Sequence, residues 1–176
     1  MGDFKRVKRE LAYQGTILKV YKDYIEINEH KAVWDYVHHK GGAAVVPVRK
    51  DGKILMVRQY RNAIDRYTLE IPAGAFDTEK ESGAVCVARE LEEETGYRAQ
   101  SIEWLINVRS MVAFTNEKVE IYVAKDLIPS VQHLDDEESI ELEAYTIEEL
   151  KEKIFAGEIE DSKTVAALMA YSVKYE

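Results

Sequence analysis

Residues 74–97 read GAFDTEKESGAVCVARELEEETGY. The second half of this stretch crowds four glutamates, Glu90, Glu92, Glu93 and Glu94, into the end of one predicted helix. Because successive residues of an α-helix are about 100° apart, Glu90, Glu93 and Glu94 share one arc, while Glu92 points nearly to the opposite side. Three carboxylates therefore converge on one small patch of the helix.

This patch costs stability unless a cation binds there. Glu90 and Glu94 are like charges at i,i+4, which repel by a few tenths of a kcal/mol, and anions near a helix C-terminus oppose the helix dipole. A bound divalent ion would reverse both effects. We predict that the helix ends at Gly96, since glycine readily adopts the left-handed conformation that stops a helix. An apolar stripe for packing on a sheet is predicted at Ala84, Val87, Ala88 and Leu91.

Carboxylate oxygens of this kind suit Mg²⁺ or Mn²⁺. Mg²⁺ usually keeps several waters and completes its coordination with substrate phosphates. The sequence therefore predicts a phosphate ester or anhydride as the substrate. A merely solvated acidic helix face is the alternative for a glutamate run on its own, but an arginine, two glycines and an upstream glutamate stand in register with this one.

The same residues resemble the Nudix box, written G-x5-E-x7-R-E-U-x-E-E-x-G-U, in which U is a bulky apolar residue. The positions that match at the family's spacing are Glu81, Arg89, Glu90, Leu91, Glu93, Glu94, Gly96 and Tyr97. Six residues instead of five separate Gly74 from Glu81, which we interpret as a tolerated loop insertion. The alternative, Lys80 at the glutamate position, would break the spacing to Arg89. The segment LEIPAG at 69–74 resembles the ADP-ribose pyrophosphatases of this family.

The resemblance implies an α+β fold, the Nudix α/β/α sandwich with a mixed sheet, plus an N-terminal antiparallel β meander. We expect an accessory and dimerisation segment at residues 1–40 and a Nudix hydrolase domain at residues 41–176. The alternating pattern predicts the meander over Gly15–Val37. The next predicted strand is at 43–48, and a hairpin turn at Asp51 and Gly52 leads from it into a strand at 53–60. Further strands are predicted at 102–109, 118–124 and 140–145. Two helices follow, one starting with the capping box of Thr146 and Glu149 and one capped by Asp161 or Ser162.

For activity, the resemblance implies hydrolysis of the pyrophosphate bond of a nucleoside diphosphate derivative, with ADP-ribose giving AMP and ribose 5-phosphate. It implies metal ligation by Glu90, Glu94 and Glu93, with the backbone carbonyl of Ala73. Arg89 and Glu81 would orient the carboxylates through an ion pair.

A general base is also needed to take the proton of the attacking water. The resemblance places it in the acidic loop at Glu138, so that the catalytic set is Glu138, Glu93 and Arg89. Asp136 and Glu137 are close alternatives, and an ordinary exposed acidic loop remains a further interpretation.

Substrate contacts are implied at three places. Arg61, in RQYR at 58–61, resembles an arginine that binds the diphosphate or the distal ribose, and a guanidinium suits phosphate geometry. Glu70 is expected to assist, whereas Arg58 is expected to be structural. Trp34 would stack on adenine, with a plain strand residue covering the core as the alternative.

One position departs from the ADP-ribose pattern, because Val112 stands where a proline often accompanies that specificity. Phe114 and Glu117 still match the same segment. Pyrophosphatases of ADP-sugars or GDP-sugars therefore remain alternatives. A non-catalytic Nudix module that binds nucleotides is another, but it would be expected to have lost the glutamates that this chain retains.

Composition restricts the class of protein. The chain has 176 residues, 46% of them hydrophobic, with a net charge of −9 and a pI near 5.1, which argues against a nucleic-acid surface or a polybasic membrane anchor. No apolar run could span a bilayer, and the charged N-terminus does not look like a signal peptide. The single cysteine, Cys86, agrees with a reducing compartment, so we expect a cytoplasmic protein. The family resemblance implies a domain-swapped homodimer.

Overall fold

A computed structural model describes residues 3–78, 80–134 and 139–176. The chain forms two compact units. The N-terminal unit comprises Met1–Gly41 and Arg109–Lys118, and the central unit comprises Gly42–Val108 and Val119–Glu176. The loop 109–118 thus groups with the N-terminal segment, although it is distant from it in sequence.

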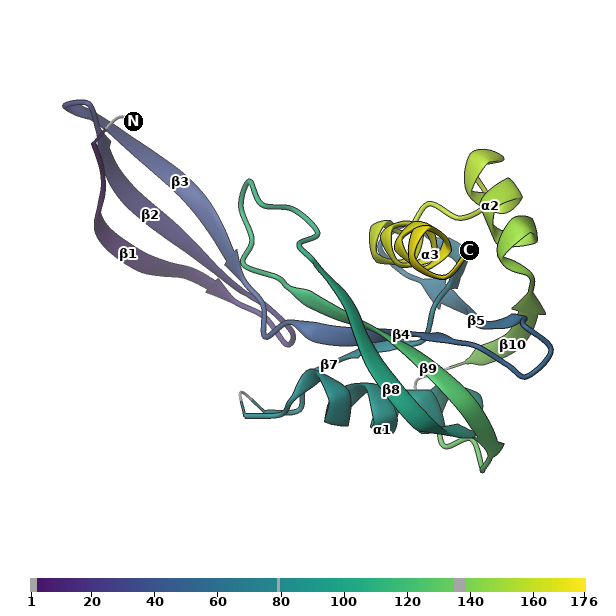
Figure 1. Ribbon diagram of the computed structural model, residues 1–176. Coiled ribbons are helices and arrows are strands. Elements are labelled where there is room, and N and C mark those ends of the chain that lie inside the picture. Colours follow the sequence, from purple (N-terminus) through teal and green to yellow (C-terminus); the bar gives the residue numbers. More distant parts are fainter. Residues whose placement is uncertain (1–2, 79, 135–138) are drawn as a thin grey trace. The chain divides into compact units, whose positions relative to one another are not determined.

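The N-terminal unit is an antiparallel sheet of β1 (Phe4–Gln14), β2 (Lys19–Ile27) and β3 (His30–His38), in that order (Figure 1). The predicted meander is confirmed for β2 and β3, which turn at Asn28 and Glu29, both with positive φ. The prediction missed β1. Its sequence FKRVKRELAYQ carries charge on both faces and is mostly exposed, so it shows no clear alternation of apolar and polar residues. Strand β1 is instead identified by its backbone pairing with β2.

In the part of the chain that the structure describes, the central unit contains two sheets and three helices. A mixed sheet has the order β7 (Ala73–Ala75), β4 (Gly42–Pro47), β9 (Val119–Pro129), β8 (Tyr97–Val108), and β4 and β9 are parallel. An antiparallel sheet has the order β10 (Ile140–Tyr145), β5 (Ile54–Arg61), β6 (Arg66–Glu70). The helices are α1 (Gly83–Thr95), α2 (Ile147–Phe155) and α3 (Ser162–Tyr175).

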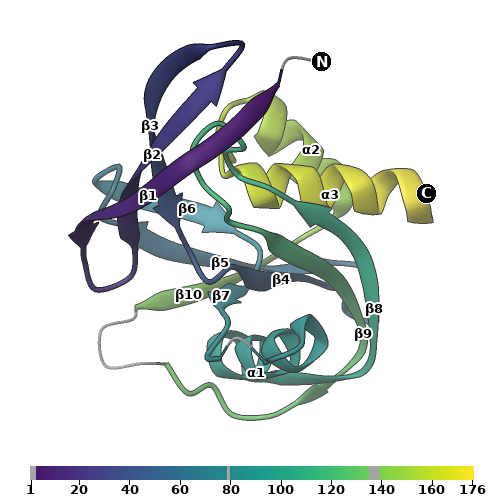
Figure 2. The same ribbon diagram turned by 90° about the vertical axis from the view of Figure 1, so that its left-hand side faces the viewer.

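Strand β4 shows how these layers are held together, because every one of its residues is buried. Odd-numbered side chains of β4 face α1 and even-numbered ones face α2 and α3, as alternation along a strand requires. The two apolar clusters include Ala43, Val45, Val87 and Leu91 on one side and Ala44, Val46, Leu150 and Leu168 on the other. Figures 1 and 2 show α1 on one face of the mixed sheet and α3 on the other. The predicted α/β/α sandwich is confirmed.

Helix α1 ends where the sequence predicts. Ser82 caps its N-terminus, and Gly96 has φ 67° and donates its N–H to the Glu92 carbonyl over 2.8 Å. The predicted apolar stripe is partly wrong, because Ala84 and Ala88 are exposed. The buried arc is rotated toward Cys86 and Glu94 instead. One of the acidic side chains is therefore on the face that packs against the sheet.

Other elements differ in extent from the prediction. The turn at Gly52 forms, but β4 and β5 belong to different sheets. An isolated bridge pairs Val48, the residue after β4, with Ile54. The short strands β6 and β7 were missed, and β8 and β9 are longer than predicted. Strands β8 and β9 extend beyond their buried residues, and no alternation of apolar and polar residues marks where they end.

The predicted capping box of Thr146 and Glu149 is present at α2, and Asp161 is the N-cap of α3. Within the described ranges, no helix is long and apolar enough to cross a membrane.

Candidate active site

Two acidic side chains of α1, Glu90 and Glu94, reach strand β7. Glu94 is only 3% exposed, and its Oε2 accepts a hydrogen bond from the Ala73 N–H over 3.0 Å. The Glu90 carboxylate lies against Gly74, where an added Cβ would be 1.9 Å from Oε1 of Glu90. A side chain at position 74 would therefore displace this carboxylate, so the glycine lets α1 and β7 approach each other.

Arg89 contacts the carboxylates of Glu90, Glu93 and Glu81. Its Nη1 donates to Oε1 of Glu90 over 2.6 Å and to Oε2 of Glu93 over 3.1 Å. The predicted ion pair with Glu81 is present, with 3.4 Å between Nε and Oε1. Burial opposes the charged form of Arg89, but Glu90, Glu81 and Glu93 outweigh it and raise the pKa of the guanidinium.

Glu92 lies apart from this cluster, as the helix geometry predicts. Its Oε1 accepts hydrogen bonds from Arg98 and from the Ser130 hydroxyl, each over 2.7 Å. Of the four crowded glutamates, Glu92 is therefore the natural control for the other three.

The segment after β9 covers the C-terminal end of α1. The His133 N–H donates to the Glu93 carbonyl over 3.0 Å, and the Gln132 side chain donates to the Glu94 carbonyl over 2.6 Å. These bonds satisfy carbonyls that a helix end leaves unpaired. The chain then enters the acidic loop, whose candidate bases Glu138, Asp136 and Glu137 lie outside the described residues.

The donor chemistry of Glu90, Glu93 and Glu94 fits a hard divalent cation, because all three offer carboxylate oxygens. Within residues 3–78, 80–134 and 139–176, no three His, Cys, Asp or Glu side chains are grouped as ligands of a single ion. Glu90 and Glu93 are turned toward Nη1 of Arg89. Joint ligation of an ion by these two side chains would require their carboxylates to turn from Arg89.

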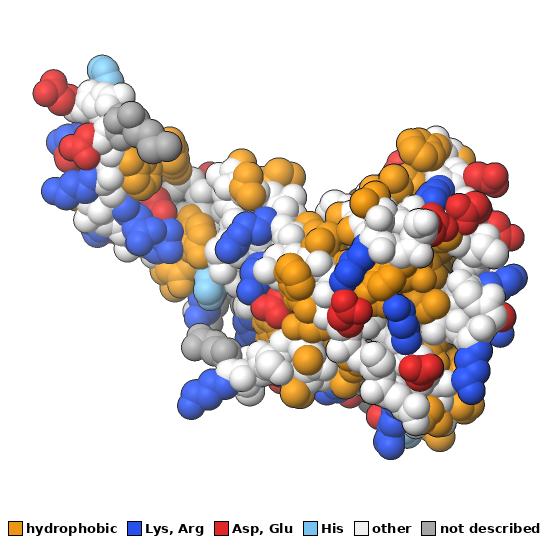
Figure 3. All heavy atoms as spheres, in the orientation of Figure 1, with side chains coloured by type: hydrophobic (Ala, Val, Ile, Leu, Met, Phe, Trp, Pro, Cys, Tyr) orange, Lys and Arg blue, Asp and Glu red, His pale blue; other side chains and the backbone are white. Residues whose placement is uncertain are grey.

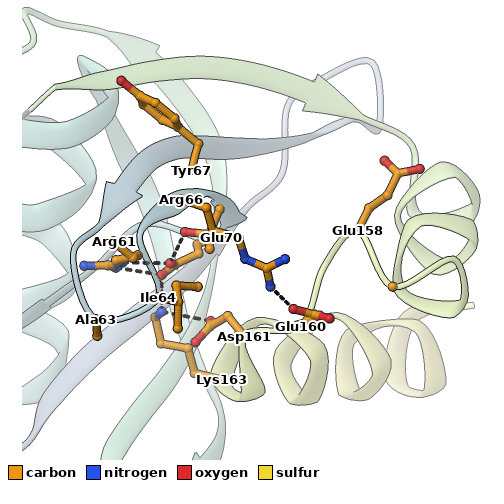
Figure 4. Close-up of a pocket in the computed structure, with 12 residues that line it drawn as sticks. Arg61, Ala63, Ile64, Arg66, Tyr67, Glu70, Glu158, Glu160, Asp161 and Lys163 are labelled. Atoms are coloured by element: carbon orange, nitrogen blue, oxygen red, sulfur yellow. Dashed lines mark hydrogen bonds and ion pairs between the residues drawn. The ribbon is translucent and has the colours of Figure 1, made fainter.

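A second charged cluster is built on β5, β6 and α3. Arg61 donates from Nε and Nη2 to the two carboxylate oxygens of Glu70, over 2.8 and 2.6 Å. The same carboxylate, 2% exposed, accepts from the Thr68 hydroxyl over 2.6 Å and from Nζ of Lys163 (Figure 4). Burial alone would raise the pKa of Glu70, but Arg61 and Lys163 lower it to about 2.

This cluster borders a cavity of about 520 Å³, whose lining includes Arg61, Arg66, Tyr67, Thr68, Asp161 and Lys163. The hydrogen bond to Glu70 is the main cause that raises the pKa of Arg61, and the Glu94 carboxylate contributes to the same shift. Two residues, Ile71 and Pro72, separate Glu70 from Ala73, which binds Glu94. A short segment of the central unit therefore connects the residues of the cavity to the strand that Glu94 contacts.

A family model of the NUDIX domain matches residues 38–168. This chain belongs to the Nudix family. It is 36% identical over 167 residues to the methanol dehydrogenase activator of Bacillus methanolicus, covering 93% of this chain and 90% of that protein. It is 32% identical to the ADP-ribose pyrophosphatase of Bacillus subtilis, with 97% and 91% covered, and 31% identical to that of Mycobacterium tuberculosis, with 96% and 83% covered.

The solved structures agree on the fold. A crystal structure of an ADP compounds hydrolase superposes with a TM-score of 0.87, at 20% identity, over 97% of this chain and 93% of that chain. The resemblance of residues 74–97 to the Nudix box is thus matched by the family model and by the architecture.

In the N-terminal unit of this Nudix protein, Trp34 lies on β3 opposite Asp23 of β2. It is 49% exposed, and its ring centroid lies 5.9 Å from that of Phe4. The loop that carries Val112 is fixed to the end of β3, because the Val37 N–H donates to the Phe114 carbonyl over 2.7 Å. Adenine stacking by Trp34 stays a prediction.

Sequence reasoning missed Lys163, which lies 93 residues from Glu70. One signal was present: a lysine in the first turn of a helix opposes the helix dipole, which indicates that another anion holds it. The identity of that anion depends on how β6 and α3 pack together, which no local pattern specifies.

The lowered pKa of Glu70 predicts that this Nudix protein loses stability at acid pH. The pKa of Glu70 is about 2 in the folded state against an ordinary 4.5, so its stabilising contribution is complete above about pH 4.5 and is lost as the pH falls through 2. We expect the free energy of unfolding to fall over this interval by on the order of 3 kcal/mol more in the wild type than in Glu70→Gln. Urea unfolding at several pH values measures this, and parallel pH profiles for the two proteins would contradict it.

Proposed function

We propose that this protein hydrolyses the pyrophosphate bond of a nucleoside diphosphate derivative, with ADP-ribose as the preferred substrate. The products would be AMP and ribose 5-phosphate. The observation that carries the proposal is the approach of Glu90 and Glu94 to β7, the strand that follows the Arg61–Glu70 pair by three residues. Similarity to two ADP-ribose pyrophosphatases supports the choice of substrate.

In this proposal Glu90, Glu94 and Glu93, with the Ala73 carbonyl, hold Mg²⁺ or Mn²⁺. A bound divalent ion supplies neutralisation of the phosphate oxygens and helps to deprotonate water. Arg89 keeps Glu90 and Glu93 together through Nη1. Glu81 in turn holds Arg89, and its Oε2 accepts the Asp77 N–H over 2.7 Å, which ties it to the insertion loop.

Hydrolysis of the pyrophosphate forms one bond to phosphorus and breaks another. The attacking water forms a bond to one phosphorus, and the bond from that phosphorus to the bridging oxygen breaks. The proton of the water passes to a general base, for which we propose Glu138, with Asp136 and Glu137 as alternatives. The leaving phosphate carries the bridging oxygen away.

Arg61 is the proposed phosphate ligand. Its Nε and Nη2 are committed to Glu70, whereas Nη1 has no hydrogen-bond partner among the residues that the structure describes. A guanidinium held on one edge by a carboxylate can present its other edge to a phosphate oxygen at little entropic cost. Glu70 would then act by holding Arg61, and Trp34 would contact the base.

Specific observations support an alternative class of substrate and a second function. Val112 in place of the proline favours testing other nucleotide sugars, such as ADP-sugars and GDP-sugars. Similarity to a methanol dehydrogenase activator supports activation of a dehydrogenase as a second function. A non-catalytic nucleotide-binding module is disfavoured, because Glu90, Glu93 and Glu94 are all retained.

The test is a comparison of kcat/KM for ADP-ribose, ADP-glucose, GDP-mannose, diadenosine polyphosphates and dNTPs, each with Mg²⁺ and with Mn²⁺. ADP-ribose should be hydrolysed with the highest kcat/KM. Preference for another nucleotide sugar would replace the substrate and keep the reaction. Turnover of none, together with a faster methanol dehydrogenase reaction on adding the protein, would favour the second function.

We also propose that the protein is a homodimer formed through its N-terminal unit. Ile25 is the one apolar side chain of this unit, among described residues, that belongs to the buried core. A three-stranded sheet with so little apolar burial needs further cover, and Figure 3 shows apolar side chains exposed along it. The exposed set is Phe4, Val7, Leu11, Tyr13, Ile17, Val33, Trp34, Met111, Val112 and Phe114.

Changing Val7 and Val33 together to glutamate should convert the dimer to a monomer. Both line an apolar groove of about 390 Å³ in this unit, and two buried carboxylates would strongly disfavour association. Light scattering after gel filtration measures the mass, with Val173→Glu on the exposed face of α3 as the control. A wild type that is monomeric at micromolar concentration would refute the proposal.

A cytoplasmic location is proposed as well, supported by the single buried thiol of Cys86. Cell fractionation that recovered the protein outside the cytoplasm would refute this.

A further inference from the structure

Lys163 occupies an unusual environment for a lysine. Its side chain is only 16% exposed, in the first turn of α3, where a cation opposes the helix dipole. Its Nζ contacts the Glu70 carboxylate and, over 2.8 Å, Oδ2 of Asp161. Asp161 is already engaged as the N-cap, accepting from the N–H and the hydroxyl of Thr164 over 3.0 and 2.6 Å. The contacts with Glu70 and Asp161 together offset the burial of the lysine.

The Glu70 carboxylate is shared between two cations. Arg61 binds both of its oxygens, Lys163 binds Oε2, and Thr68 donates to Oε1. Four donors fix the plane of a carboxylate that is almost fully buried. Because Arg61 binds in a two-point manner, fixing the plane of Glu70 also fixes the plane of the guanidinium and the direction of Nη1. Figure 4 shows these side chains converging from β5, β6 and α3.

The charges of this cluster balance, with Arg61 and Lys163 against Glu70 and Asp161. Without Lys163 the cluster would carry a net negative charge beside Arg61. That charge would repel a diphosphate, and Glu70 would keep only one cation to hold its orientation. Both effects weaken the same event, the binding of a phosphate group by Nη1 of Arg61.

We infer that Lys163 is a positioning residue of the hydrolase, which acts through Glu70 to hold Arg61 in the orientation that binds the diphosphate. This inference rests on the proposed function. Lys163 itself does not contact the reacting atoms. The role extends the active site from the Nudix box to the first turn of α3, 74 residues beyond Arg89 in the sequence.

The test is the steady-state kinetics of Lys163→Met with ADP-ribose and Mg²⁺. The KM should rise about tenfold while kcat changes less than about threefold, because the lost interaction serves binding equally in the ground state and the transition state. Lys163→Arg should restore the KM to within about threefold of wild type, since it returns the charge. Lys174→Met, on the exposed C-terminal turn of the same helix and paired with Glu103, is the matched control.

A double-mutant cycle separates positioning from a general structural role. In an Arg61→Met background, adding Lys163→Met should raise the KM much less than it does in the wild type, because no guanidinium remains to be oriented and only the effect of the lost charge persists. Melting temperatures accompany each variant, and Lys163→Gln, which keeps a polar end, replaces Lys163→Met if the latter does not fold.

The outcomes are distinct. An active wild type with an unchanged KM in Lys163→Met, or equal effects of Lys163→Met with and without Arg61, would overturn this inference alone. A wild type that hydrolyses none of the nucleotide derivatives would overturn the proposed function and this inference with it.

Discussion

Replacing Glu94 by glutamine is expected to lower kcat for ADP-ribose by roughly 10²–10³-fold, because a metal ligand supports several kcal/mol of transition-state charge stabilisation. Glutamine keeps the length of the side chain and an oxygen that can still accept the Ala73 N–H. The fold should therefore survive, and the loss should reflect the missing charge. Initial rates at saturating Mg²⁺, together with the melting temperature, measure the two effects separately.

Glu92→Gln is the matched control for this substitution. It removes an identical charge two residues away, from a side chain that binds Arg98 and Ser130 on the opposite face. Its rate should stay within about twofold of wild type, since surface pairs of this kind contribute little. Equal losses in the two variants would mean that overall helix charge, and not the patch, supports the reaction.

Substitution of Gly74 by alanine is expected to lower activity at least about tenfold and to leave the melting temperature nearly unchanged. The new Cβ would lie 1.9 and 2.0 Å from Oε1 and Cδ of Glu90. Because the clash is with the end of a flexible side chain, Glu90 can swing away at little cost in stability. Displacement of one ligand by about an ångström or more should weaken metal binding and rate together.

Mn²⁺ titration followed by activity measures this effect, and the apparent metal affinity of Gly74→Ala should fall at least about tenfold. The control is Ala75→Ser at the adjacent exposed position of β7, which adds one atom away from Glu90. A Gly74→Ala variant with wild-type metal affinity would show that Glu90 does not hold the ion.

Local patterns in the sequence predicted most of the central unit. The helix of residues 83–95, its glycine stop and the capping box at Thr146 depend on contacts within a few residues, and such features can be read from sequence. Strand β4 was recognised as a short apolar run, since both of its faces are covered. Strand β1 was missed because its charges hide any period, and its pairing with β2 across a turn is what defines it.

In the candidate site too, local sequence patterns predicted some features, whereas others depend on how distant elements pack together. The spacing of Glu90, Glu93 and Glu94 predicted one shared patch, but in the structure Glu94 is buried against β7 while Glu90 and Glu93 bind Arg89. The Arg89–Glu81 pair followed from the box. The close approach of Glu90 to Gly74 and the bond from Ala73 to Glu94 depend on how α1 packs against β7. Arg61 and Glu70 were each identified, but their mutual pairing and the contribution of Lys163 arise from three elements meeting in space.

In the proposed function, the α1 carboxylates support metal-dependent cleavage of a pyrophosphate bond. Its most direct test is product analysis of ADP-ribose incubated with the protein and Mg²⁺, with and without excess EDTA. We expect AMP and ribose 5-phosphate in equal amounts, loss of both products with EDTA, and their return when Mg²⁺ is restored. Intact ADP-ribose with Mg²⁺ present, or cleavage that EDTA does not affect, would contradict it.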